Sequence, residues 1–121
     1  MARVSINPIE IKNHSEFKDA GAYADLLKAI DATDGAEIKL DGHDERCVLL
    51  VHNSASSASN VTVKAGNGLQ GVSDLVYSIP ASNMALIVLE SGKFKNVSGD
   101  DKGKAIIKGA ASLKVAFIKL P

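Results

Sequence analysis

The chain has 121 residues, enough for one domain around a single hydrophobic core. Lys plus Arg and Asp plus Glu both number 14, so the formal net charge is zero and the basic excess typical of nucleic-acid binders is missing. A single cysteine excludes an internal disulfide, and we expect neither a signal peptide nor a membrane span, which predicts a protein made in the cytoplasm without a nucleic-acid or membrane partner.

The first predicted element is an extended N-terminal arm over residues 1–14. Its run "RVSINPIEI" (3–11) fits an arm or an edge strand, because Pro8 has no backbone N–H to donate and cannot lie in a central strand. No linker long enough to divide the remainder is found. We therefore expect residues 15–121 to form a single domain.

A short helix is predicted next, over about residues 22–32. Apolar residues in the segment 15–33 recur at three- and four-residue steps, as they do on one face of a helix. Gly21 weakens the first half of that segment, and Asp34-Gly35 marks a stop.

From residue 36 onward the pattern becomes β. Apolar segments recur about every 8–12 residues, with turn residues between them and no helices. Residues 46–53 and 84–90 are apolar on both faces, while Leu75, Tyr77 and Ile79 share one face of their strand. The predicted strands are 36–40, 46–53, 60–65, 73–80, 84–90, 102–109 and 113–121. Together these patterns predict a mainly β fold: an antiparallel β-sandwich or barrel of about seven or eight strands with one short N-terminal helix.

Three glycines in "VTVKAGNGLQGVSDL" (61–75) have the spacing of a dinucleotide-binding fingerprint: Gly66-x-Gly68-x-x-Gly71. That site requires a helix to start at the third glycine and the chain to return in a parallel strand. Only about a dozen residues separate Gly71 from Met84, and a proline lies among them. We therefore predict a β–β connection without a cofactor, in which the glycines supply positive φ angles.

Other candidate chemistry is sparse. The histidines, His14, His43 and His52, lack the spacing of metal ligands, and the acidic turn "DGHDER" (41–46) lacks the longer calcium-loop pattern. Cys47 opens an apolar strand, which is typical of a buried structural thiol rather than a nucleophile. Five aromatic residues, mostly on apolar faces, argue against a platform that stacks sugars or bases. We predict no catalytic, cofactor or metal site, and no enzyme.

One longer segment carries a resemblance to a known family. Within 47–99 an apolar strand ends in Asn53, "TVKAGNG" precedes "SDL", and "IPAS" precedes a strand ending "LES" with Phe94 after it; the chain closes with "KVAFIKLP". This arrangement resembles the small decoration, or head cement, proteins of tailed bacteriophages, over roughly the last two thirds of the chain but not over 15–33. The resemblance implies a non-enzymatic β-sandwich in the virion, bound to the capsid exterior, with the major capsid protein lattice as its partner.

The resemblance also leads us to expect particular contacts. The N-terminal arm and one edge of the sandwich are expected to touch the capsid, so that deleting residues 2–12 would leave a folded domain that no longer binds. The arm residues expected to make contact are Val4, Ile6, Pro8, Ile9 and Ile11. A homotrimer would suit threefold lattice points, and the two strands that are apolar on both faces, 46–53 and 84–90, could then form the subunit interface. Alternatively, the predicted helix covers the second apolar face of these strands. The alternative function is an immunoglobulin-like adhesion or ligand-binding module, because a similar succession of strands and turns occurs there.

Overall fold

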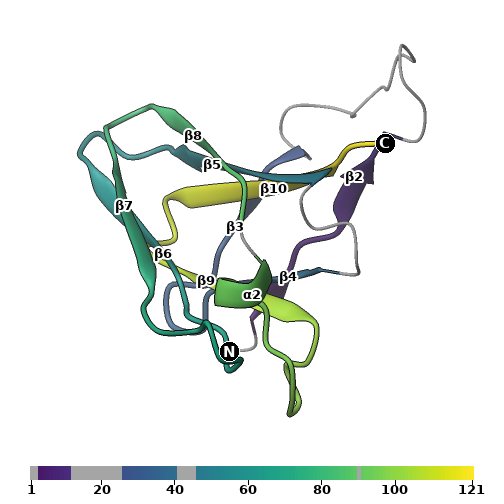
Figure 1. The fold of residues 1–121 in the computed structure, drawn as a ribbon. Coiled ribbons are helices and arrows are strands. Elements are labelled where there is room, and N and C mark those ends of the chain that lie inside the picture. Colours follow the sequence, from purple (N-terminus) through teal and green to yellow (C-terminus); the bar gives the residue numbers. More distant parts are fainter. Residues whose placement is uncertain (1–2, 12–25, 41–45, 90) are drawn as a thin grey trace.

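The computed structural model of the chain describes residues 3–11, 26–40, 46–89 and 91–121, and these residues form a mainly β fold. The first sheet contains, in spatial order, β1 (Val4–Ser5), β4 (Ala36–Lys39), β9 (Lys104–Lys108), β6 (Ser59–Val63) and β7 (Leu75–Ile79). The second sheet contains β2 (Pro8–Glu10), β10 (Leu113–Lys119), β5 (Cys47–Asn53) and β8 (Met84–Ile87), and β3 (Lys28–Ala29) also pairs with β10. The short helix α2 (Ser91–Phe94) follows β8 (Figure 1).

The prediction of a mainly β fold is confirmed, but the predicted antiparallel pairing is only partly right. β1 pairs with β4 and β2 pairs with β10 in parallel, so both sheets are mixed. Neither sheet closes into a barrel within the described part of the chain. The parallel pairs arise because no hairpin joins these strands, and long connections allow either direction. The ten described strands exceed the predicted number because the arm and the predicted helix contribute three short ones.

The helix predicted over residues 22–32 is not supported: residues 22–25 lie outside the described part, Leu26 is the one helical residue among those described, and the segment then becomes a strand. Lys28–Ala29 is the strand β3, which pairs antiparallel with β10. Leu27 and Ile30 are buried on either side of this strand, and the amide N of Ile30 donates to the carbonyl of Leu113 at 3.2 Å. A three-residue spacing of apolar residues fits a helix face, but contact with β10 overrides that local preference.

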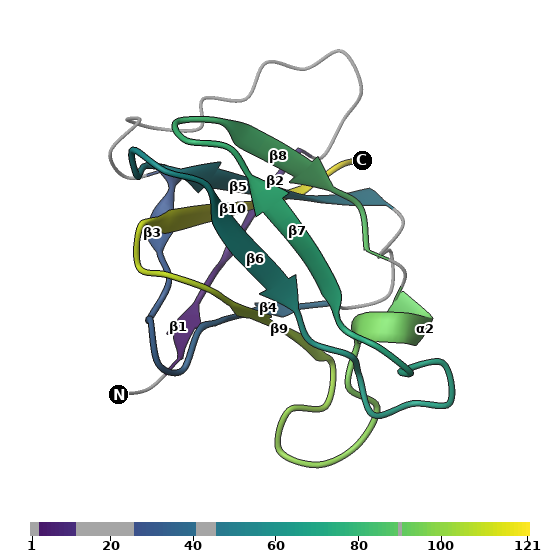
Figure 2. The same ribbon diagram turned by 90° about the vertical axis from the view of Figure 1, so that its left-hand side faces the viewer.

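The hydrophobic core lies between the two sheets. In Figures 1 and 2 the strands β5 and β10 of the second sheet lie above β4 and β9 of the first. Side chains of both sheets meet there; among the most deeply buried are Ile38, Val61, Val63 and Ile107 of the first sheet and Leu49, Val51, Val115 and Phe117 of the second. β5 lies between β10 and β8, which explains its continuous apolar sequence.

A buried asparagine anchors the end of β5. The Nδ2 of Asn53 donates to the carbonyl oxygens of Ser57 and Ile79, both at 2.9 Å, and its Oδ1 accepts from the amide of Ala55 at 3.0 Å. Its own backbone N–H donates to the carbonyl of Asn83 at 3.0 Å. These bonds satisfy polar groups that are out of reach of water and fix the turn between β7 and β8 to the second sheet.

Candidate functional site

The N-terminal arm is extended, but it is built into both sheets. Val4 pairs with Ala36 in the first sheet, and Pro8 pairs with Phe117 at the edge of the second. Between them the amide of Ile6 donates to the carbonyl of Glu37 at 3.0 Å, and the Ile6 side chain is only 4% exposed. Deleting the arm would therefore remove two strands and a core residue, contrary to the expectation of an intact domain.

The five arm residues expected to contact the capsid do not share one surface. Ile6 lies in the core, and Val4 is half-buried against it. Pro8 is exposed, while Ile9 and Ile11 are half-buried at the edge formed by β2. Only Pro8, Ile9 and Ile11 are placed to touch a partner, because a buried side chain such as that of Ile6 offers no surface for contact.

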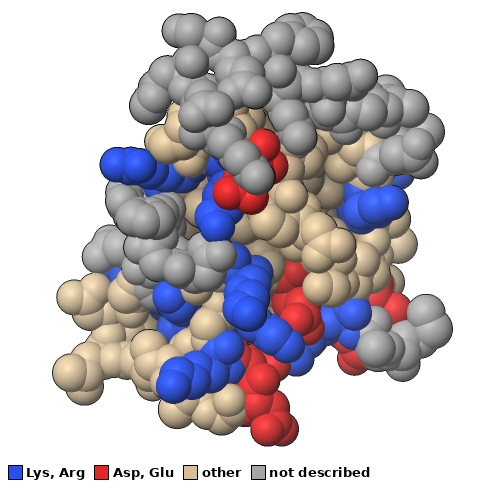
Figure 3. Space-filling model, turned by 90° about the vertical axis from the view of Figure 1, so that its right-hand side faces the viewer, with Lys and Arg blue, Asp and Glu red and all other residues tan. Residues whose placement is uncertain are grey.

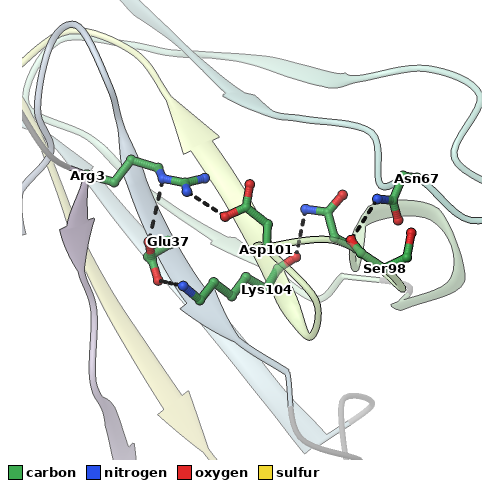
Figure 4. Close-up of polar contacts among 7 residues, drawn as sticks. Arg3, Glu37, Asn67, Ser98, Asp101 and Lys104 are labelled. Atoms are coloured by element: carbon green, nitrogen blue, oxygen red, sulfur yellow. Dashed lines mark hydrogen bonds and ion pairs between the residues drawn. The ribbon is translucent and has the colours of Figure 1, made fainter.

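Ion pairs fasten the start of the arm to the first sheet. The guanidinium of Arg3 bridges Glu37, at 3.5 Å from Nε to Oε1, and Asp101, while Lys104 approaches the other oxygen of Glu37 at 2.8 Å (Figure 4). The hydrogen bond from Arg3 lowers the pKa of Asp101. Figure 3 shows acidic and basic side chains interspersed on this side of the molecule. Each of these cations lies beside a carboxylate, so the ion pairs hold the arm against the first sheet, which is a structural role.

The glycines of the dinucleotide-like motif lie in the loop that joins β6 to β7, its antiparallel neighbour in the first sheet. The positive φ angles predicted for Gly66, Gly68 and Gly71 are wrong. Among the described glycines, positive φ angles occur at Gly35, Gly99, Gly103 and Gly109. The three loop glycines therefore need another explanation.

Close backbone approach supplies that explanation. The amide of Gly66 donates to the carbonyl of Lys93 at 2.8 Å, and a Cβ on Gly66 would collide with the carbonyl oxygen of Lys95. A Cβ on Gly71 would collide with the carbonyl oxygen of Gly66, whereas one on Gly68 would make only ordinary contacts, the nearest with Val97 Cγ1 at 3.5 Å. The loop thus packs tightly against the segment after β8, a contact that spacing in the sequence does not reveal.

Side-chain hydrogen bonds hold the same loop in place. Asn67 donates from Nδ2 to the carbonyl of Ser98 at 3.0 Å (Figure 4). Its Oδ1 accepts from the amide of Val97 at 2.7 Å. At the other end of the loop, Asp74 accepts from Lys64 Nζ at 2.8 Å and from the amide of Ala65 at 2.7 Å. The Asn67 side chain is thus bonded to the backbone of Val97 and Ser98. A phosphate-binding loop would instead present free backbone N–H groups to its ligand.

The described cysteine and histidine do not form a nucleophile pair. Cys47 is buried and faces the core, whereas His52 lies on the opposite face of β5, where residues alternate in burial. His14, His43 and the acidic residues at 41–45 lie outside the described part of the chain. Within that part, no three His, Cys, Asp or Glu side chains gather closely enough to hold a metal ion, and no helix has the length and apolar character to cross a membrane.

The most distinctive surface is an apolar face where the two sheets end. β7 and β8 are the last strands of their sheets and diverge from the turn at residues 80–83 that joins them (Figures 1 and 2). Leu75 and Tyr77 share the strand face of the buried Ile79, yet they are 37% and 50% exposed. The sequence pattern predicted their shared face correctly, but the second sheet does not cover this end of β7.

On β8, the outward residues are also apolar. Met84 and Leu86 are exposed, and Leu86 is 72% exposed, although the segment 84–90 reads as a strand buried on both faces. Between β7 and β8 lies a cleft of about 400 Å³, lined by Leu75, Tyr77, Met84, Ala85, Leu86 and Ile87. We call the exposed residues Leu75, Val76, Tyr77, Met84, Leu86 and Val88 the β7–β8 face. They lie on both sides of these edge strands: Leu75 and Tyr77 point to the core side of β7 and Val76 away from it, while Met84 and Leu86 lie opposite the core-packed Ala85 and Ile87.

A signal for this face was present in the sequence. Residues 75–89 contain no charged residue and no histidine, and they span both edge strands. Edge strands are usually protected by charges, by proline or by bulges, because their unpaired N–H and C=O groups invite further pairing. Neither β7 nor β8 carries a charge of this kind. Comparisons of the chain with protein-family models, with curated proteins and with solved structures found no match.

Proposed function

We propose that the protein is a non-enzymatic virion structural protein: a β-sandwich-like decoration, or cement, protein that binds the outside of a phage capsid and stabilises the head lattice. Its partner is the major capsid protein. The resemblance over residues 47–99 supports this function. The observation that carries it is the β7–β8 face, because exposed apolar side chains on two uncharged edge strands are typical of a component of a larger assembly.

The edge formed by β2 is the proposed contact with the capsid. Pro8 is exposed there and Ile9 is half-buried, and β2 is the last strand on its side of the second sheet. Its position at the opposite end of the sheet from β8 leaves it accessible when the β7–β8 face is covered. The half-buried Ile9 can lie against a neighbouring protein surface, whereas Pro8 and the exposed Glu10 disfavour contact by strand addition.

The stabilising mechanism is mass action. A protein that binds the assembled lattice, and not the separated subunits, adds its binding free energy to the lattice. A micromolar site corresponds to about 8 kcal/mol at standard state, so many moderate sites together stabilise a shell. Bridging of neighbouring capsid subunits then raises the temperature at which the shell opens.

The test uses particles from which the protein has been stripped. We expect stripped particles to release DNA at a lower temperature than intact ones, and purified protein to restore the original temperature when it is added back. The matched variant is Ile9→Asp at the β2 edge, with Lys39→Asp, an exposed position on the first sheet, as control. Equal release temperatures for stripped and restored particles would overturn the cement role, and failure to co-sediment with capsids would overturn the virion assignment.

A second candidate function is an adhesion or ligand-binding module. The cleft between β7 and β8 favours it, because a concavity of this size matches the lower range of small-molecule sites. An apolar ligand that protects the wild-type protein against thermal unfolding, but not a Tyr77→Arg variant, would support this function in place of the first.

A further inference from the structure

We propose that the Asn67-Gly68 peptide is a self-modification site, at which the folded chain converts Asn67 to aspartate and isoaspartate with loss of ammonia. The site lies in the loop that joins β6 to β7, and the reaction needs only water from the solvent. This inference does not depend on the capsid proposal and is tested on the purified chain alone.

The attacking atom is the backbone nitrogen of Gly68. Among the described residues its N–H donates to no acceptor, although the Gly68 carbonyl accepts from the amide of Gly71 at 3.1 Å. Glycine has no side chain to shield this nitrogen, and a Cβ built on Gly68 would find its nearest neighbour, Val97 Cγ1, at 3.5 Å. The situation at Asn96 is the reverse, because the N–H of the following Val97 is already bonded to the Oδ1 of Asn67.

The side chain of Asn67 presents an activated carbonyl to this nitrogen. Its Oδ1 accepts from the amide of Val97 at 2.7 Å, so a backbone N–H already points at the oxygen on which negative charge develops during the attack. A donor fixed in this position before the reaction lowers the barrier, as in an oxyanion hole. Asn67 is exposed, so that base and water from the solvent reach the site.

The reaction is intramolecular, because the attacking and attacked atoms belong to neighbouring groups of one chain. Solvent base removes the N–H proton of Gly68, and the nitrogen forms a bond to Cγ of Asn67. The bond from Cγ to Nδ2 breaks, the departing nitrogen takes up a proton, and ammonia leaves a cyclic succinimide. Water then opens the ring: attack at Cγ gives aspartate, and attack at the main-chain carbonyl carbon gives isoaspartate. Water is consumed and ammonia is released, without an oxidant or a reductant.

The products cannot anchor the loop as Asn67 does. Aspartate lacks the Nδ2 that donates to the carbonyl of Ser98 at 3.0 Å, and it places a carboxylate oxygen beside that carbonyl instead. Isoaspartate lengthens the main chain by a methylene group, just before a turn in which a Cβ on Gly71 would already collide with the carbonyl oxygen of Gly66. The loop that is loosened carries two fully exposed apolar side chains, Leu69 and Val72.

The experiment incubates the purified, folded full chain at physiological temperature in mildly alkaline buffer. Peptide mass mapping follows each asparagine, and released ammonia is measured independently. We expect Asn67 to be converted at least about tenfold faster than Asn60, since a single oxyanion donor contributes more than that in enzymes. Asn60 is the matched site, because it is also exposed but is followed by the β-branched Val61 within β6.

The matched variant is Gly68→Ala, which the loop accommodates without a collision. Its methyl group shields the attacking nitrogen, so conversion at Asn67 should slow while the rate at Asn60 stays unchanged. Circular dichroism checks that each protein remains folded during the incubation. Conversion of Asn67 no faster than that of Asn60 would overturn the proposal, and so would a rate at Asn67 that Gly68→Ala leaves unchanged.

The effect on the loop is measured separately with Asn67→Asp, which has the sequence of one product. Asn60→Asp is its control, because it adds the same charge at an exposed position of a strand. Asn67→Asp should unfold at a lower temperature than Asn60→Asp, since it alone removes the donor to the carbonyl of Ser98. Equal unfolding temperatures would overturn the inference that the modification loosens the loop.

Discussion

Asn53 and Ile79, on different sheets, are joined by a buried hydrogen bond of 2.9 Å from the Asn53 Nδ2 to the Ile79 carbonyl oxygen. Asn53 is fully buried. The bond connects the end of β5 to the end of β7, and so it positions the turn from which the β7–β8 face extends. A polar side chain at the last position of an apolar strand thereby determines where the two edge strands lie.

Replacing Asn53 should destabilise the protein strongly. In Asn53→Ala the carbonyls of Ile79 and Ser57 lose their donor, and the amide of Ala55 loses its acceptor. Buried polar groups left without partners cost about 1–3 kcal/mol each, so we expect the free energy of unfolding to fall by about 2–4 kcal/mol. Urea denaturation measures this loss. The control is Asn60→Ala on the exposed surface, which should stay within about 0.5 kcal/mol of the wild type.

The loop glycines should differ sharply from one another. Gly71→Ala would force the backbone away from Gly66, and we expect it to cost more than about 2 kcal/mol. Gly68→Ala meets only the flexible end of Val97 and should cost less than about 1 kcal/mol. Thermal unfolding of both variants checks this ranking. Equal effects would show that close approach is not what these glycines provide.

The same loop should bind no dinucleotide. Its hydrogen-bonding groups are engaged with the segment around Val97 and Ser98, and an antiparallel strand follows in place of a crossover helix. Titration with NAD or FAD should give no saturable signal. A micromolar dissociation constant that Gly68→Val abolishes would contradict this interpretation.

Much of the fold is predictable because alternation of apolar residues is a local property. Ala36, Ile38 and Leu40 alternate with Glu37 and Lys39 in the sequence, and all three are buried. The central position of β5 follows equally from its continuous apolar sequence. In contrast, Leu27 and Ile30 have a spacing that suits a helix, and only their contact with β10, far away in the sequence, makes this segment a strand.

The apolar face was harder to predict for a related reason. The pattern of Leu75, Tyr77 and Ile79 shows which side of β7 is apolar, but not how far the opposite sheet extends over it. A hydrophobic residue has the same sequence signature whether its own chain or a partner covers it. The uncharged run 75–89 is the additional signal that sets these two strands apart from an ordinary edge protected by charges.

Acid should weaken the loop at Asp74. The hydrogen bond from Lys64, and then that from the amide of Ala65, lower the pKa of Asp74 below its ordinary value of 3.8. A carboxyl group whose pKa is lower in the folded state contributes stability above its unfolded pKa, and this contribution disappears as the pH falls through the folded pKa. Asp74→Asn should therefore be less stable than the wild type at pH 7, and the difference should shrink below about pH 4. Urea midpoints of both proteins between pH 7 and pH 2 measure this; a difference independent of pH would mean that the charge of Asp74 is not its cause.

The N-terminal arm should prove to be part of the folded core. Ile6 is 4% exposed and lies between two strands that join different sheets, so Ile6→Ala leaves a cavity and should lower the free energy of unfolding by about 2–5 kcal/mol. Ile9→Ala, at a half-buried position on the edge strand, should cost about 1 kcal/mol or less. Urea denaturation of the two variants separates the structural role of the arm from any role in contact. If Ile6→Ala is as mild as Ile9→Ala, the arm is not held in the core as the structure has it. If Ile6→Ala is costly, removing residues 2–12 should unfold the domain, and capsid binding must then be tested with surface variants such as Ile9→Asp.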